Sequence, residues 1–172
     1  MIDKCKRGES SGFTGLYNLH AKEVYNSIYR IINHTAEAED ILQESFLAAF
    51  QAIGGFENTG GFRAWVKRVA INKSIDRLRK KKIKFVELEP TRVSAPEEDP
   101  IDEETFAFEV EKVRKAIDEL PEGDKLIVQL YLFENIPQME IAQMLGITNN
   151  AVRTQYHRAK QKVLRNLKGG IS

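Results

Sequence analysis

The spacing of apolar residues constrains the fold of this chain more than any other feature of its sequence. Between residues 13 and 80, and again between residues 110 and 167, apolar side chains recur every three or four positions, which is the period of a helix with one buried face. Neither stretch shows the sustained alternation of apolar and polar residues that a half-buried strand requires. The chain is therefore predicted to be all-α, and its 172 residues suffice for one domain or two small ones.

Three helices are predicted in the first stretch. They cover residues 13–32, 35–53 and 62–82, and two glycine pairs separate the second helix from the third. Thr35 is the predicted N-cap of the second helix, because a threonine hydroxyl can accept a hydrogen bond from the first helical turn. The spacing of the third helix turns Trp65 inward, so we interpret this residue first as a core side chain.

The second stretch ends in a helix-turn-helix pattern. A short helix over 138–145 is followed by a turn containing Gly146 and by a long basic helix over 149–167. In this motif the second helix lies in the major groove and reads bases with its N-terminal half. The predicted buried stripe of the long helix consists of Val152, Tyr156, Ala159 and Val163. The predicted exposed flanks carry side chains suited to base edges and phosphates, namely Asn150, Arg153, Thr154, His157, Arg158 and Gln161.

Charge divides the chain into three blocks. The net charge is +6 over residues 1–84, −9 over 85–111 and +4 over 112–172. Nucleic acid would bind the two basic blocks and be repelled by the acidic block, which also has the proline-rich composition of a linker. The predicted organisation is two small helical domains, over 8–84 and 110–168, joined by a flexible acidic linker over 85–109.

A dense run of cations ends the third predicted helix, from Asp76 through Arg77 to Lys82. Such a run attracts a phosphate backbone. Phe56, Phe62 and Trp65 precede it, and aromatic side chains beside cations can stack on unpaired bases. This region is therefore a second candidate for nucleic-acid binding.

An acidic stripe follows one side of the second predicted helix. It contains Asp40, Gln43, Glu44 and Gln51, whose spacing places them on one face together with Leu47. An exposed apolar residue within an acidic stripe is typical of a surface that docks on a protein. An ordinary solvated helix face explains the spacing equally well.

The sequence argues against an enzyme. Its histidines, at positions 20, 34 and 157, lack the spacing of metal ligands, and no glycine-rich phosphate loop is present. We therefore expect no catalytic residues, no metal and no cofactor. Cys5 is predicted to be a surface thiol without a role. With no signal peptide and no run of 18 apolar residues, we expect a cytoplasmic protein without membrane insertion.

Three segments together resemble the extracytoplasmic-function group of sigma factors, within the sigma-70 family of RNA polymerase sigma factors. They are AEDILQESF at 38–46; FRAWVKRVAIN at 62–72 with Asp76 and Arg77; and LP at 120–121 followed by EIAQMLGI at 140–147, AVR at 151–153 and HRAK at 157–160. The resemblance implies that region 2 docks on the clamp helices of bacterial RNA polymerase and melts the −10 element. It implies that region 4 reads the −35 element. It also implies an anti-sigma partner, and we expect a monomer.

The resemblance assigns roles to residues by their position in these segments. The implied polymerase contacts are Asp40, Gln43, Glu44 and Leu47. The implied −10 DNA contacts are Asn58, Thr59, Gly60, Asn72, Lys73, Asp76, Arg77, Arg79 and Lys80, with residues 58–61 and Asn72 forming a pocket for a flipped base. The implied −35 DNA contacts are Asn149, Asn150, Arg153, Thr154, His157 and Arg158.

The chain departs from the family pattern near the helix-turn-helix. Pro137-Gln138-Met139 stands where an aromatic residue is usual, and Gln155 stands where an arginine is usual. The long helix also opens with Asn149-Asn150-Ala151-Val152 instead of Gly-Thr-Val. These changes fall on or near the end expected to read DNA, so the promoter sequence does not follow from the resemblance. Two other functions stay open: a stand-alone helix-turn-helix regulator, and an interaction module such as a sequestering decoy.

Overall fold

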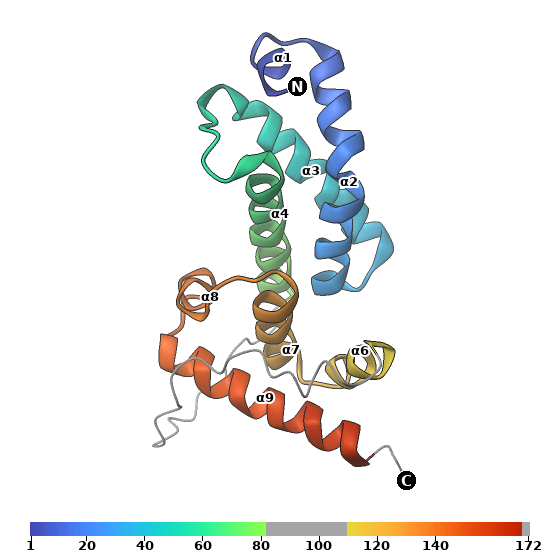
Figure 1. Cartoon of the computed structure of the whole chain (residues 1–172), viewed down its shortest axis with the longest axis vertical. Coiled ribbons are helices and arrows are strands. Elements are labelled where there is room, and N and C mark those ends of the chain that lie inside the picture. The colour runs from blue at the N-terminus through green and yellow to red at the C-terminus, as the bar shows by residue number, and fades with distance from the viewer. Residues whose placement is uncertain (82–109, 170–172) are drawn as a thin grey trace. The chain divides into compact units, whose positions relative to one another are not determined.

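A computed structural model describes residues 1–81 and 110–169, and all regular elements of these residues are helical (Figure 1). The chain divides into two compact units, one ending at Lys81 and the other beginning at Lys82. This confirms the prediction of an all-α fold with two helical domains. The predicted acidic linker, over 85–109, lies outside the described residues, as does the last lysine of the cation run.

The first unit is built from three long helices that pack against one another. Its elements are α1 (Ile2–Lys6), α2 (Ser10–Ile32), α3 (Thr35–Gln51), the short 3₁₀ turn η1 (Ile53–Gly55) and α4 (Gly61–Lys80). Contacts join all three pairs of the long helices. Val24, Ile28, Ile41 and Val66 have no exposed surface and form the centre of this core. The apolar stripes read from the sequence thus become the mutual contact faces of α2, α3 and α4.

The second unit packs its shorter helices onto one long helix. Its elements are α6 (Val110–Asp118), α7 (Glu122–Val128), the π-helical turn η2 (Gln129–Phe133), α8 (Gln138–Leu145) and α9 (Asn149–Gly169). Helices α6, α7 and α8 all contact α9. Val152, Tyr156, Ala159 and Val163 are each at most 5% exposed, which confirms the predicted stripe. Gly146, with φ of 69°, makes the turn between α8 and α9.

One local prediction in the first unit was wrong, and one was met only at the edge of the core. The N-cap of α3 is His34 and not Thr35, because the His34 Nδ1 accepts a hydrogen bond from the Glu37 N–H at 3.2 Å. Thr35 is instead the first helical residue. Trp65 is half-buried, so it belongs to the edge of the core more than to its centre.

The prediction that Cys5 is a surface thiol was also wrong. Cys5 lies on α1, a five-residue helix that packs against α2, and only 2% of the residue is exposed. Burial raises the pKa of the Cys5 thiol above its ordinary value. One turn of helix is too short to show a period, which explains why the sequence did not reveal α1.

Candidate nucleic-acid interface

The acidic stripe of α3 lies on the surface of the first unit. Asp40, Gln43 and Glu44 are exposed, as the spacing predicted, and Leu47 is 59% exposed. The opposite side of α3 carries its buried residues, among them Ile41 and others of the core. The helix therefore presents one apolar side chain within a polar and acidic surface.

Two ion pairs join α3 to the basic end of α4, and one of them involves Glu44 of the stripe. Arg77 Nη2 lies 3.6 Å from Glu44 Oε1, and Lys81 Nζ lies 2.6 Å from Glu37 Oε2. The hydrogen bond from Lys81 holds the pKa of Glu37 below its ordinary value. A predicted polymerase contact, Glu44, is therefore the partner of a predicted DNA contact, Arg77. Sequence spacing gave no sign of this pairing, because the two residues belong to different helices.

The outer face of α4 carries most of the other predicted −10 contacts. Asn72, Asp76, Arg79 and Lys80 are exposed, and Lys73 is half-buried. Helical spacing places the first three on one face of α4. Within that face Arg79 Nη1 pairs with Asp76 Oδ1 at 3.2 Å, so Asp76 offsets part of the positive charge there. The face is polar and mixed in charge along its length.

The loop before α4 is anchored by aromatic residues at its start. Phe56 is 7% exposed and stacks on Trp65, with ring centroids 4.7 Å apart and an angle of 28° between the rings. Phe62 meets Trp65 edge to face at 5.8 Å. Gly60, the N-cap of α4, has φ of 103°, a conformation that favours glycine. The predicted contacts Asn58 and Thr59 lie between these two fixed points and are exposed.

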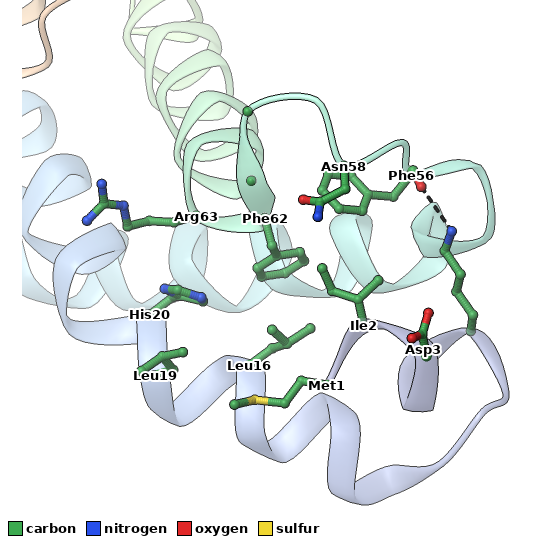
Figure 2. A pocket seen from close by; sticks show the side chains of 13 residues that line it. Met1, Ile2, Asp3, Leu16, Leu19, His20, Phe56, Asn58, Phe62 and Arg63 are labelled. Atoms are coloured by element: carbon green, nitrogen blue, oxygen red, sulfur yellow. Dashed lines mark hydrogen bonds between the residues drawn. The ribbon is translucent and has the colours of Figure 1, made fainter.

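A cavity of about 670 Å³ opens beside this loop (Figure 2). Side chains of α1, α2, the loop and the first turn of α4 line it, and they include Asn58, Gly60, His20 and Arg63. Burial lowers the pKa of His20 below its ordinary value. Neither Thr59 nor Asn72 is among the lining residues. The structure thus brings part of the predicted base pocket together with residues of α1 and α2 that sequence reasoning missed.

In the second unit, the N-terminal half of α9 carries the predicted −35 contacts. Asn150 and Arg158 are exposed, and Arg153, Thr154 and His157, which were also predicted on the exposed flanks, are half-buried. Arg153 Nε and Thr154 Oγ1 are buried and make no hydrogen bond within the described residues. Such unsatisfied groups are costly unless a ligand supplies the partner.

The start of α9 is capped from the turn before it, and its buried side includes two residues beyond the predicted stripe, Gln155 and Leu167. Thr148 Oγ1 accepts a hydrogen bond from the Ala151 N–H at 3.1 Å. Gln155 is 4% exposed and faces inward. The departure from the family pattern at Gln155 therefore lies on the buried side of this helix.

The described residues provide neither a metal site nor a membrane span. No group of three or more His, Cys, Asp or Glu side chains is placed to hold a metal ion. No described helix combines the length and apolar character that crossing a membrane requires. Two helical units, one carrying a basic helix-turn-helix, define the class as a helical DNA-binding protein.

Comparisons with known proteins identify the family. The family model for Sigma-70 region 2 matches residues 16–83, and that for Sigma-70 region 4 matches residues 111–163. The extracytoplasmic-function sigma factor SigW of Bacillus subtilis is 28% identical over 97% of this chain and 95% of its own length. The RNA polymerase sigma factor SigV of the same organism is 30% identical over 81% of each chain. The chain belongs to the sigma-70 family of RNA polymerase sigma factors, in the extracytoplasmic-function group.

Solved structures share the fold. CnrH in complex with the cytosolic domain of CnrY matches with a TM-score of 0.57 and 21% identity, over 98% of this chain and 95% of that chain. RpoE in complex with the anti-sigma factor NepR from Bartonella quintana matches with a TM-score of 0.57 and 17% identity, over 91% and 97%. With the family established, the chain is an RNA polymerase sigma factor and not a stand-alone regulator. Sigma factors initiate transcription and are not enzymes.

Proposed function

We propose that the first unit docks on the core of bacterial RNA polymerase and opens the −10 element, while the second unit reads the −35 element as duplex DNA. The proposed domain limits are 8–84 and 110–168, with residues 85–109 as the linker. The observation that carries the proposal is the exposed acidic stripe of α3, which shares an ion pair with the basic end of α4. One small unit therefore has surfaces of opposite character for a protein and for DNA.

The proposed polymerase contacts are Asp40, Gln43, Glu44 and Leu47. Leu47 is an exposed apolar anchor, and carboxylates around such an anchor give orientation and specificity to an interface. The clamp helices of the polymerase core are the proposed partner of this surface.

The proposed −10 contacts lie in the loop and on α4: Asn58, Thr59, Gly60, Asn72, Lys73, Asp76, Arg77, Arg79 and Lys80. Extruding a base from a duplex costs a few kcal/mol, and stacking on aromatic side chains with hydrogen bonds to the base edge offsets that cost. The partly exposed Trp65 and the exposed Asn58 and Asn72 suit these two roles.

The proposed −35 contacts are Asn149, Asn150, Arg153, Thr154, His157 and Arg158, at the N-terminal half of α9. Arginine pairs with guanine edges and asparagine with adenine edges in the major groove. The buried Nε of Arg153 lacks a partner within the described residues, which supports a role in which DNA supplies one.

A cytoplasmic monomer regulated by an anti-sigma factor completes the proposal. The two solved structures described above are complexes, one with the cytosolic domain of CnrY and one with the anti-sigma factor NepR. An inhibitor of this kind would cover the polymerase and DNA surfaces until it is released.

Substitution of Asp40 and Glu44 by alanine tests the docking surface. The double variant is expected to bind core polymerase at least about tenfold more weakly, as removal of central interface contacts does. Glu39→Ala is the matched control, because it removes a carboxylate from α3 about 100° around the helix from Asp40. Arg77→Ala is the second control, since Glu44→Ala also breaks the pair with Arg77. Unchanged affinity of the double variant would refute the proposed docking surface.

Run-off transcription with core polymerase on a random promoter library tests the whole function. A set of transcribed templates with common −10 and −35 sequences is expected. A sequestering decoy would bind polymerase and start no RNA from any template. That result would replace the proposal with the decoy function.

A further inference from the structure

The short helix α1 is joined to the loop before α4 by a hydrogen bond between residues far apart in the sequence. The Lys6 ammonium donates to the main-chain carbonyl of Phe56 at 3.0 Å, in a part-buried position (Figure 2). A hydrogen bond from an ammonium group is charge-assisted and stronger than one between neutral groups. Lys6 therefore holds the main chain at the start of this loop from the side of α1.

The side chain of Phe56 connects the same point to α4. Its ring stacks on Trp65, which lies two helical turns before Asn72 on the same face of α4. The carbonyl of Phe56 thus bonds to α1 while its ring packs on the helix that carries the proposed −10 contacts. Moving α1 would release the carbonyl and leave Phe56 held by its ring and by the hydrogen bond from its N–H to the Ile53 carbonyl.

The docking of α1 on α2 depends on the absence of a side chain at Gly12. A Cβ at Gly12 would lie 2.8 Å from the main-chain nitrogen of Cys5, 2.8 Å from Lys4 Cβ and 2.9 Å from the Met1 carbonyl oxygen. Main-chain atoms cannot yield without a shift of α1 itself. A Cβ at Gly15 would meet only the Met1 side chain, at 2.8 Å from its sulfur and 3.4 Å from its Cγ. A methionine side chain can rotate away, so Gly15 is tolerant where Gly12 is not.

We propose that α1 is a positioning element for residues 56–60, which acts through the Lys6–Phe56 hydrogen bond and holds the loop in the shape that engages the unpaired −10 strand. This inference rests on the proposed −10 function of the loop. Lys6 is a positioning residue in this mechanism and makes no contact with DNA. Its loss should impair opening of the promoter and leave docking on polymerase unchanged, because the α3 stripe does not include α1.

Cys5 provides a direct measure of whether α1 is docked. It is the one cysteine of the chain, and it is 2% exposed on the docked helix. A buried, protonated thiol reacts slowly with dithiobis(nitrobenzoic acid), whereas a solvent-exposed thiol reacts quickly. Gly12→Ala should therefore speed the reaction of Cys5, and Gly15→Ala should leave its rate near that of the wild type.

The experiment uses the full chain bound to core polymerase on a promoter selected from the random library. Lys6→Met removes the donor and keeps most of the side-chain stem, while Lys6→Arg retains a cationic donor. Permanganate reactivity of −10 thymines should fall about tenfold in Lys6→Met and in Gly12→Ala, the effect of losing one charge-assisted hydrogen bond. Lys6→Arg and Gly15→Ala should resemble the wild type.

A template with a pre-opened −10 region should restore much of the initiation that Lys6→Met and Gly12→Ala lose. The affinity for core polymerase should be equal in all variants.

Several results would overturn the inference. One is wild-type opening by Lys6→Met, and another is an equal loss in Lys6→Met and Lys6→Arg. A third is unchanged Cys5 reactivity in Gly12→Ala, since α1 would then be docked despite the added methyl group. Failure of the wild-type holoenzyme to open any promoter would instead refute the proposed function. The Cys5 measurement on the free chain separates the two failures, because it tests the docking of α1 without DNA.

Discussion

The basic helices of the two units, α4 and α9, differ in the surroundings of their cations. In the first unit, Arg77 and Lys67 of α4 and its C-cap Lys81 lie near carboxylates of neighbouring helices, with N–O distances of 3.6, 3.3 and 2.6 Å. In the second unit, Arg153 on α9 keeps its Nε buried without a hydrogen bond within the described residues. The first arrangement holds helices together with charges that DNA would also attract. The second keeps an unsatisfied donor on the helix proposed to enter the major groove.

This difference indicates two ways of binding DNA. Phosphates that bind α4 must compete with protein carboxylates, so the first unit should bind DNA weakly until polymerase engages the carboxylates of α3. The second unit gains a partner for a buried group when it binds, so its affinity should depend strongly on base sequence.

The two units also differ in the polar side chains that they bury. Ser45 and Ser74 of the first unit donate to the carbonyl four residues earlier, at 2.6 and 2.8 Å, and so satisfy themselves within one helix. The second unit buries Gln129, Gln138 and Gln155, whose longer amides need partners from other segments. The first unit thus buries short hydroxyl groups and the second buries longer amides, of which Gln138 Oε1 makes no hydrogen bond within the described residues.

The largest expected effect comes from deleting core volume in one unit at a time. Ile141→Ala, at a fully buried position of α8, should destabilise the second unit by about 2–5 kcal/mol, through lost burial and the cavity left behind. Binding to −35 DNA should fall, while core polymerase binding should persist. Trp65, the one tryptophan, reports the melting of the first unit by fluorescence, and circular dichroism reports the whole chain.

The corresponding variant in the first unit is Ile28→Ala, at a fully buried position of α2. It should lower the melting temperature seen by Trp65 and spare −35 binding. If Ile141→Ala shifts the Trp65 transition as far as Ile28→Ala does, the two units unfold together. The chain would then behave as one cooperative structure.

Arg153→Ala should have an intermediate effect confined to specific DNA. The variant should lose about 1–3 kcal/mol of affinity for the selected −35 sequence, the contribution of one bidentate base contact. Affinity for unrelated DNA should change little. Titrating the protein into selected and unrelated DNA at one fixed salt concentration would measure both affinities. Lys162→Ala, at an exposed position further along α9, is the control. An equal loss on every sequence would make Arg153 a phosphate contact.

The smallest expected effect is the pH dependence of the Glu37–Lys81 pair. The folded pKa of Glu37 lies below its unfolded value, so its stabilising effect is complete at neutral pH and is lost as pH falls through the folded pKa. Both side chains are partly exposed, so the effect should stay below about 1 kcal/mol. Urea unfolding followed by Trp65 fluorescence should show a wild-type advantage over Glu37→Gln that shrinks on acidification. If the difference in free energy of unfolding between the wild type and Glu37→Gln stays constant from pH 7 to acidic pH, this ion pair is not its source.

The sequence pattern correctly predicted those features that depend on a single helix. Helix α8 begins and ends at the predicted residues 138 and 145, and the stripe of α9 is buried as predicted. The exposure of Asp40 and Leu47 on α3 followed from spacing alone. In each case the burial of a side chain depends on its angle around one helix axis, which the sequence encodes directly.

Contacts between distant segments were beyond the reach of that reasoning. Phe56 follows Lys6 by fifty positions, and no local period connects them. The pairing of Glu44 with Arg77 depends on how α3 and α4 pack, and the burial of Cys5 depends on how closely α1 approaches Gly12. The N-cap of α3 at His34 was not predicted because histidine is not among the side chains usually found at the N-cap position.

By itself, the sequence determined two helical blocks of positive charge, an acidic segment between them and the faces that each helix buries, because these properties are set by neighbours within a turn or two. Only the tertiary structure decided which charged side chains form ion pairs, that the Cys5 thiol is buried and which helix supports the loop before α4. Those outcomes depend on distances between side chains of separate helices, and such distances exist only after the helices have packed.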